Sequence, residues 1–138
     1  MEYGKCATET TNKIIPAEEN KRKLILNNPS QRVVRKIQID GCLPVEGKRC
    51  DYMFEIDEPT TEVIYLELKG CDIEKACLQL AETIDLFLNK HRHVKKSCHI
   101  VASRVPKAGT KVQQLKVQML KNKKVELIVS TDQATVQI

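Results

Sequence analysis

Tryptophan is absent from the chain, and only 4% of its 138 residues are aromatic. So few aromatic side chains argue against a stacking platform for single-stranded nucleic acid. No apolar run approaches the roughly 20 residues that a membrane-spanning helix needs. The N-terminal residues also lack the apolar centre of a signal peptide. We therefore expect a cytoplasmic protein with no membrane segment.

Zinc-binding cysteine spacings are also missing, although cysteine itself is plentiful. The six cysteines are scattered, and no two have the Cys-x-x-Cys spacing typical of zinc sites. In a reducing compartment we expect free thiols, several of them buried as small apolar side chains. A zinc site drawn from His91, His93, His99 and Cys98 fits no common closed spacing. We prefer to interpret these histidines as a helix cap and surface residues.

The overall composition is that of an ordinary globular protein, with 41% hydrophobic and 30% charged residues. We expect one domain over residues 1–138, long enough to bury a core. The formal net charge of +5 favours a polyanionic partner but does not identify one.

The N-terminal 30 residues are predicted as a helical segment. One short helix over 5–15 would end at Pro16, because proline has no backbone N–H to continue it. A second helix over 17–26 would have acidic residues in its first turn and basic residues near its end. The stretch 23–26 is equally compatible with a strand, and the sequence leaves this alternative open.

The core is predicted over 31–129, where the period of the apolar residues changes from two to that of a helix. Short links between the first three strands favour an antiparallel meander. The predicted elements are strands at 31–39, 48–56 and 63–70, a helix at 72–89 capped by Asp72, a strand at 97–103, a helix at 111–121 and a strand at 125–129. Residues 130–138 are predicted as a tail with an edge strand.

This element order predicts an α/β fold with an αβββαβ core. Meander and crossover connections together require a mixed sheet. We expect three layers, α/β/α, with helices on both faces of the sheet.

Two charged side chains interrupt the apolar strand at 63–70. Glu67 and Lys69 lie on one face near its end, and Asp51 lies near the start of the preceding strand. In an antiparallel pair these strand ends are neighbours, so we expect Asp51 beside Glu67. Two close carboxylates repel unless a cation lies between them, and oxygen ligands suit Mg²⁺ or Mn²⁺. The pattern therefore predicts a metal site in which Lys69 assists phosphodiester hydrolysis.

Asp51, the Glu67-Leu68-Lys69 triplet and the amphipathic helix after them resemble the core of the PD-(D/E)XK nuclease superfamily. The resemblance covers about residues 32–129. It implies a restriction-endonuclease-like fold, with Asp51 and Glu67 as metal ligands and Lys69 as the catalytic lysine. The chain departs from the superfamily name at Cys50, where the name has proline.

Two auxiliary residues are implied by the same resemblance. Some members carry a glutamine on the helix after the lysine strand, and Gln79 occupies a matching place. A carboxylate on the first helix has several candidates here, Glu9, Glu18 and Glu19, among which we prefer Glu9.

Basic residues in and near the first two strands suit contacts with DNA phosphates. The candidates for nucleic-acid binding are Arg32, Arg35, Lys36, Lys48 and Arg49. We thus expect a Mg²⁺-dependent deoxyribonuclease, either an endonuclease or a structure-specific nuclease. So small a chain should act as a homodimer or within a larger defence or repair complex.

Two alternatives remain at this point. In one, the nuclease-like fold is catalytically inactive and serves DNA binding or protein interaction, with Glu67 and Lys69 as a structural ion pair. In the other, an α/β protein of unrelated function has converged on the same pattern. Metal binding distinguishes the nuclease from both.

Overall fold

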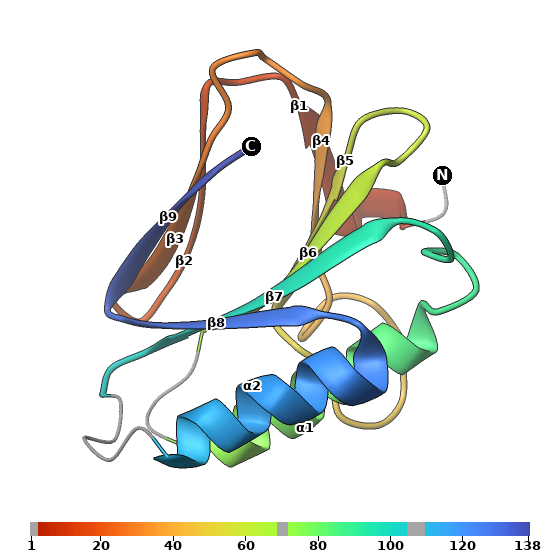
Figure 1. The fold of residues 1–138 in the computed structure, drawn as a ribbon. Coiled ribbons are helices and arrows are strands. Elements are labelled where there is room, and N and C mark those ends of the chain that lie inside the picture. The colour runs from red at the N-terminus through yellow and green to blue at the C-terminus, as the bar shows by residue number, and fades with distance from the viewer. Residues whose placement is uncertain (1–2, 69–71, 105–109) are drawn as a thin grey trace.

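A computed structural model of the chain describes residues 3–68, 72–104 and 110–138. Its centre is a six-stranded mixed sheet (Figure 1). In order of pairing, the strands of this sheet are β1 (Ala7–Thr10), β4 (Val34–Gln38), β5 (Tyr52–Ile56), β6 (Glu62–Leu68), β7 (Lys95–Ala102) and β8 (Glu126–Thr131). The predicted mixed α/β class and mixed sheet are confirmed.

The predicted core order is also found. Strands β4, β5 and β6 form an antiparallel meander, and β6, β7 and β8 are parallel. Helix α1 (Ile73–Leu86) connects β6 to β7, and helix α2 (Thr110–Lys123) connects β7 to β8. The Asp72 side chain accepts a hydrogen bond from Lys75 N at 3.0 Å, which confirms the predicted N-cap of α1. Neither helix is long and apolar enough to cross a membrane.

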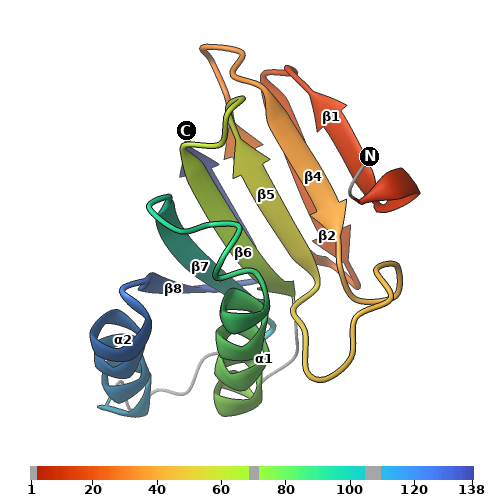
Figure 2. The ribbon, with the colours of Figure 1, turned by 90° about the vertical axis from the view of Figure 1, so that its right-hand side faces the viewer.

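The predicted α/β/α layering is wrong, because both described helices cover the same face of the sheet. Figure 2 shows α1 and α2 side by side below β6, β7 and β8. The reason lies in the strand order. Parallel β-α-β connections are almost always right-handed, and the chain moves in one direction from β6 through β7 to β8. Two such crossovers in the same direction place their helices on the same face.

The predicted helical segment at the N-terminus is also wrong. After a short 3₁₀ helix, η1 (Gly4–Cys6), the chain forms β1, β2 (Ile14–Glu19) and β3 (Arg22–Asn27). Asn20 and Lys21 connect β2 to β3 with positive φ angles of 48° and 69°. Positive φ at both positions is typical of the tight hairpin turn whose twist matches that of the strands. The turn lacks the glycine that usually signals this geometry, so the pattern also suits a helix.

The second face of the central sheet is covered by a three-stranded sheet of order β2-β3-β9. Strand β9 (Gln133–Gln137) pairs with β3 in parallel. Asp132, with φ of 61°, lies at the corner where the chain leaves β8 and enters β9. The predicted edge strand in the tail therefore exists, but it belongs to the second sheet.

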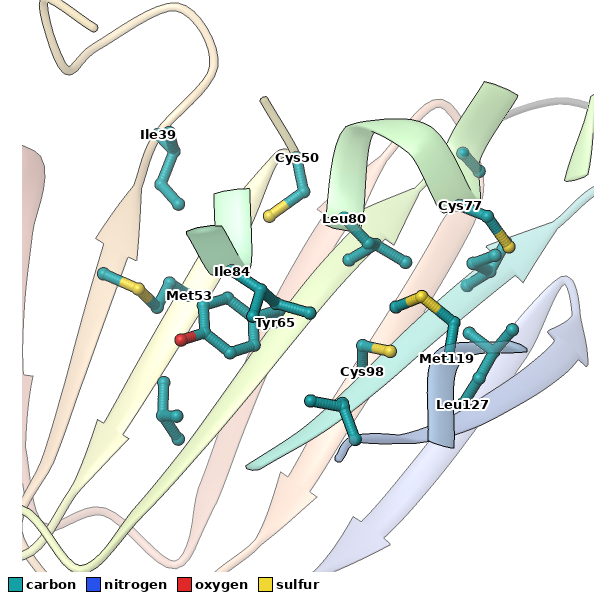
Figure 3. Close-up of a cluster of buried hydrophobic side chains, with 14 of the residues drawn as sticks. Ile39, Cys50, Met53, Tyr65, Cys77, Leu80, Ile84, Cys98, Met119 and Leu127 are labelled. Atoms are coloured by element: carbon teal, nitrogen blue, oxygen red, sulfur yellow. The ribbon is translucent and has the colours of Figure 1, made fainter. Parts of the chain in front are cut away.

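Two separate cores result from these layers. One lies between the helices and the central sheet and includes Tyr65, Leu80 and Met119 (Figure 3). The other lies between the two sheets and includes Leu24, Phe54 and Leu66. Strand β6 contributes alternate residues to both cores, as its period-2 pattern predicts.

The prediction that all cysteines are free is wrong for Cys6 and Cys42, which form a disulfide. Pairing of β1 with β4 brings the two cysteines together, with their Cα atoms 5.7 Å apart. Spacing alone does not reveal this contact, because β1 was expected to be helical. Cys50, Cys77 and Cys98 are free and buried as predicted, whereas Cys71 lies outside the described residues.

The packing of the second sheet on the central sheet can be tested at Leu24, which is fully buried between them. Leu24→Ala should lower the free energy of unfolding by about 2–5 kcal/mol, because it leaves a cavity. Leu120→Ala is the matched control, since Leu120 is 61% exposed on α2, and should change stability by less than about 0.5 kcal/mol. Urea denaturation measures both. Equal effects of the two substitutions would contradict this layer arrangement.

Candidate functional site

The antiparallel pairing of β5 with β6 brings Asp51 and Glu67 to the same end of the sheet. Tyr52 pairs with Leu66, so Asp51, immediately before β5, lies opposite Glu67. The Asp51 side chain is only 3% exposed, and Glu67 is fully buried. The structure thus places two acidic side chains together at the end of a buried strand pair.

Main-chain hydrogen bonds hold each of these carboxylates in place. The backbone N–H of Asp51 donates to Glu67 Oε1 at 3.1 Å. The backbone N–H of Leu68 donates to Asp51 Oδ2 at 2.7 Å. Each acidic residue is therefore linked to the backbone of the other strand, and the strands cannot separate without breaking both contacts.

The two carboxylates also affect the neighbouring thiol of Cys50. Burial raises the pKa of the neighbouring Cys50 thiol to about 12, and the charges of Glu67 and Asp51 add to this shift. A thiol with so high a pKa stays protonated at neutral pH, so Cys50 is unsuited to act as a nucleophile. The chemistry of the site therefore depends on its oxygen donors.

Lys69, the predicted catalytic lysine, lies outside the described residues. It follows Leu68, the last residue of β6, directly in the sequence. The described part of the site accordingly consists of the two carboxylates and the segment that supports Asp51.

Helix α1 anchors the segment that carries Asp51. Gln79 Nε2 donates to the Arg49 carbonyl oxygen at 3.3 Å. The Thr83 hydroxyl accepts a hydrogen bond from Cys50 N at 2.9 Å and donates to the Gln79 carbonyl oxygen at 2.7 Å. Gln79 is 8% exposed, and its buried Oε1 has no hydrogen-bond partner in the described structure. The predicted auxiliary glutamine thus contacts the backbone of Arg49, two residues before Asp51 in the sequence.

These donors fit a hard divalent cation that keeps several water ligands. Carboxylate and amide oxygens are typical ligands of Mg²⁺ and Mn²⁺. Within residues 3–68, 72–104 and 110–138, no group of three or more His, Cys, Asp or Glu side chains is arranged to hold a metal. A cation at Asp51 and Glu67 would therefore have few charged ligands from the described residues. This chemistry suits Mg²⁺ better than zinc.

Glu9, the preferred carboxylate of the predicted first helix, does not join this site. It lies on β1 opposite Arg35, which in turn pairs with Glu55 near the other end of β5. Glu55 lies four positions after Asp51 along an extended strand, or roughly 13 Å away. Of the other candidates, Glu19 is the last residue of β2, and its charge adds to the rise that burial causes in the pKa of Tyr52, the residue after Asp51.

The predicted DNA-binding arginines are occupied by local contacts. Arg32 forms an ion pair with Asp57 at 2.8 Å, and Arg35 contacts Glu55 at 3.2 Å and Glu58 at 3.1 Å. Both arginines lie toward the end of β5 that is far from Asp51. The guanidinium of Arg49 contacts Asp40 at 3.1 Å.

The two lysines that were predicted to bind DNA lie in different environments. Lys36 Nζ donates to the Pro16 carbonyl oxygen at 2.7 Å and lies over the Tyr52 ring, and burial lowers its pKa. Lys48 is exposed on the loop before β5. The five basic residues therefore do not form one surface around Asp51 and Glu67.

A buried polar network at the opposite end of β5 was not predicted. His91 Nε2 contacts Glu55 Oε2 at 2.6 Å, and His91 Nδ1 contacts the Tyr65 hydroxyl at 2.7 Å. The Tyr3 hydroxyl donates to Glu55 Oε2 at 2.8 Å. The interpretation of His91 as a surface residue is wrong, since it is 1% exposed. The alternation of β5 places Glu55 on the same face as Met53, but no sequence signal connects it to His91.

His99 is also buried, at 6% exposure, and burial lowers its pKa to about 4. Cys98 belongs to the core below the helices, so His99, the next residue of β7, points to the opposite face. These two potential zinc ligands therefore diverge. This geometry argues against the zinc alternative.

Comparison with known proteins gives no match to a family model, a curated protein or a solved structure. From β4 to β7 the described fold has the predicted βββαβ order, but it has strands where the first helix was predicted. The described feature that bears on function is the geometry at Asp51 and Glu67.

The Glu55 network predicts a specific acid sensitivity. Burial alone would raise the pKa of Glu55, but hydrogen bonds from His91 and Tyr3 and the Lys90 charge lower it to about 2. The stabilisation from ionised Glu55 is thus complete above its ordinary pKa, 4.5, and is lost as the pH falls toward 2. Glu55→Gln should cost about 3 kcal/mol at pH 7 and much less in strong acid.

Urea unfolding across this pH range measures the effect. Glu58→Gln is the matched control, because the Glu58 side chain is 70% exposed and also contacts Arg35. A Glu55→Gln cost that does not change with pH would contradict the role of the ionised carboxylate.

His99 predicts a second pH dependence of stability, in the range between its unfolded pKa of about 6.5 and its folded pKa of about 4. As the pH falls through this range, the unfolded chain gains a proton at His99 and the folded chain does not. The wild type should lose on the order of 2 kcal/mol between neutral pH and about 4.5 from this residue.

His99→Gln should remove that part of the pH dependence, as measured by urea unfolding. His93→Gln, at an exposed position, serves as the control and should keep it. Parallel pH profiles for wild type and His99→Gln would show that the prediction is wrong.

Proposed function

We propose that the protein is a divalent-metal-dependent nuclease that hydrolyses phosphodiester bonds in DNA. The observation that supports this most is the fixed pair of buried carboxylates, Asp51 and Glu67, at the ends of β5 and β6. Two carboxylates held side by side supply the oxygen ligands that a divalent cation such as Mg²⁺ prefers. The restriction-endonuclease-like resemblance supports the same function and suggests DNA as the substrate.

In this proposal Asp51 and Glu67 bind Mg²⁺ or Mn²⁺, and Gln79 keeps the Asp51 segment against α1. The bound cation would polarise a phosphoryl oxygen and lower the pKa of a water molecule. Because main-chain N–H groups already hold both carboxylates, their positions need little rearrangement during the reaction. The proposed role of Lys69 is to stabilise charge that develops on the phosphate.

We also propose that the protein acts as a dimer or as one component of a larger DNA-processing complex. The same site without activity would make the protein a DNA-binding or interaction module, and metal binding separates the two cases.

Neutral substitutions at the carboxylates test the proposal. Asp51→Asn and Glu67→Gln should each abolish the Mn²⁺-induced rise in melting temperature, because a neutral amide is a weaker ligand than a carboxylate. Each should also reduce cleavage of plasmid and branched DNA to background.

Asp40→Asn is the matched control, since the Asp40 carboxylate is 41% exposed and pairs with Arg49. It should keep the metal response and the cleavage of the wild type. If the wild type shows no metal response, or if the Asp51 and Glu67 variants cleave normally, the proposed function is wrong.

A further inference from the structure

The arginines of the described structure fall into two groups. Arg32, Arg35 and Arg49 form ion pairs with acidic side chains. Arg92 donates to Asn89 Oδ1 at 3.0 Å. In contrast, no hydrogen bond or ion pair connects the side chains of Arg22 and Arg104 to other described residues. Buried Arg22 Nε has no hydrogen-bond partner among the described residues.

Arg22 and Arg104 lie close to one junction between the two sheets. Asp132 N donates to the Ala102 carbonyl oxygen at 2.8 Å, and Lys23 N donates to the Asp132 carbonyl oxygen at 3.0 Å. Arg104 follows Ala102 by two residues, and Arg22 precedes Lys23. These two hydrogen bonds therefore link the start of β3 to the end of β7.

The same junction lies at the end of the molecule that carries the candidate site. Val101 pairs with Leu68, the residue after Glu67. Figure 1 shows the β2–β3 turn, the β8–β9 corner and the carboxyl ends of β6 and β7 at one end of the fold. The junction thus lies at the same end of the central sheet as Asp51 and Glu67, although by alternation these carboxylates belong to the face that the helices cover.

The alternation of side chains along β3 shows toward which face of the strand the Arg22 side chain points. It shares a face with Leu24 and Leu26, which are buried between the two sheets. Arg22 therefore lies at the open end of the space between the sheets, half-buried. A buried N–H donor without an acceptor is costly, and a phosphate oxygen would satisfy it.

We propose that Arg22 and Arg104 clamp the phosphodiester backbone of a nucleic-acid strand across the carboxyl ends of β6 and β7. This inference rests on the proposed function and adds the residues that hold the substrate. Arginine suits the role because its planar guanidinium binds phosphate through two parallel hydrogen bonds. The clamp differs from the predicted set of Arg32, Arg35 and Arg49, whose guanidinium groups are neutralised locally.

Glu19 opposes the clamp. It pairs with Arg22 across the hairpin and raises the pKa of Tyr52 beside Asp51, in addition to the effect of burial. Its negative charge should weaken the attraction of phosphate to this edge. Removal of Glu19 should therefore have the opposite effect to removal of either arginine.

Fluorescence anisotropy with a short labelled DNA duplex, in EDTA to prevent cleavage, tests the clamp. Arg22→Gln and Arg104→Gln should each weaken binding about five- to tenfold at low salt, and each should reduce the salt-dependence slope by about 0.9. Glu19→Gln should tighten binding a few-fold. An RNA duplex of the same sequence, measured in parallel, shows which nucleic acid supplies the phosphates.

Arg92→Gln is the matched control, because Arg92 is exposed and precedes the opposite end of β7. It should leave affinity and slope unchanged. Equal losses in Arg92→Gln and the clamp variants, or no binding by the wild type at low salt, would overturn the proposal.

A separate readout distinguishes failure of the clamp from failure of the nuclease proposal. The clamp variants should keep the Mn²⁺-induced rise in melting temperature, which also shows that they are folded. Weakened DNA binding in these variants, together with normal cleavage by Asp51→Asn, would support the clamp and reject the metal site. Normal DNA binding in the clamp variants, with loss of the metal response in Asp51→Asn, would do the reverse.

Discussion

Burial of β6 on both faces is the constraint on which the rest of this structure depends. Every residue from Val63 to Leu68 is buried, so both faces of the strand need an apolar cover. Helices α1 and α2 supply one cover, because two right-handed crossovers in the same direction place them together. The other cover comes from the hairpin of β2 and β3 and from β9, which join into a second sheet. The two ends of the chain thus complete a core whose centre is β6.

The candidate site lies where these covering layers end. Position along β5 decides the chemistry of its acidic residues. Asp51 and Glu55 lie near opposite ends of the buried pair of strands β5 and β6. Glu55 is surrounded by His91, Tyr3 and basic side chains, which stabilise its ionised form. Asp51 instead accepts a main-chain hydrogen bond beside a second carboxylate. The first arrangement stabilises the fold, and the second suits the binding of a cation.

Local ion pairs also decide which basic side chains remain available to a ligand. Several basic residues that the sequence predicts as DNA contacts form ion pairs with acidic residues of neighbouring strands and turns. Those pairs depend on strand register, which composition does not reveal. Arg22 and Arg104 form no pattern in the sequence, yet the junction of the two sheets brings them to the end of the central sheet that carries Asp51 and Glu67.

The sequence by itself determined the βββαβ core, the alternation of β6 and the proximity of Asp51 to Glu67. These features depend on local periodicity and on short links, so neighbouring residues encode them. Only the tertiary structure decided that residues 14–27 form a hairpin, that Cys6 bonds to Cys42 and that His91 is buried against Glu55. Each of these features depends on a partner distant in the chain. The apolar residues of the N-terminal segment suit either a helix or a strand, and the uncovered face of the central sheet selected the strand.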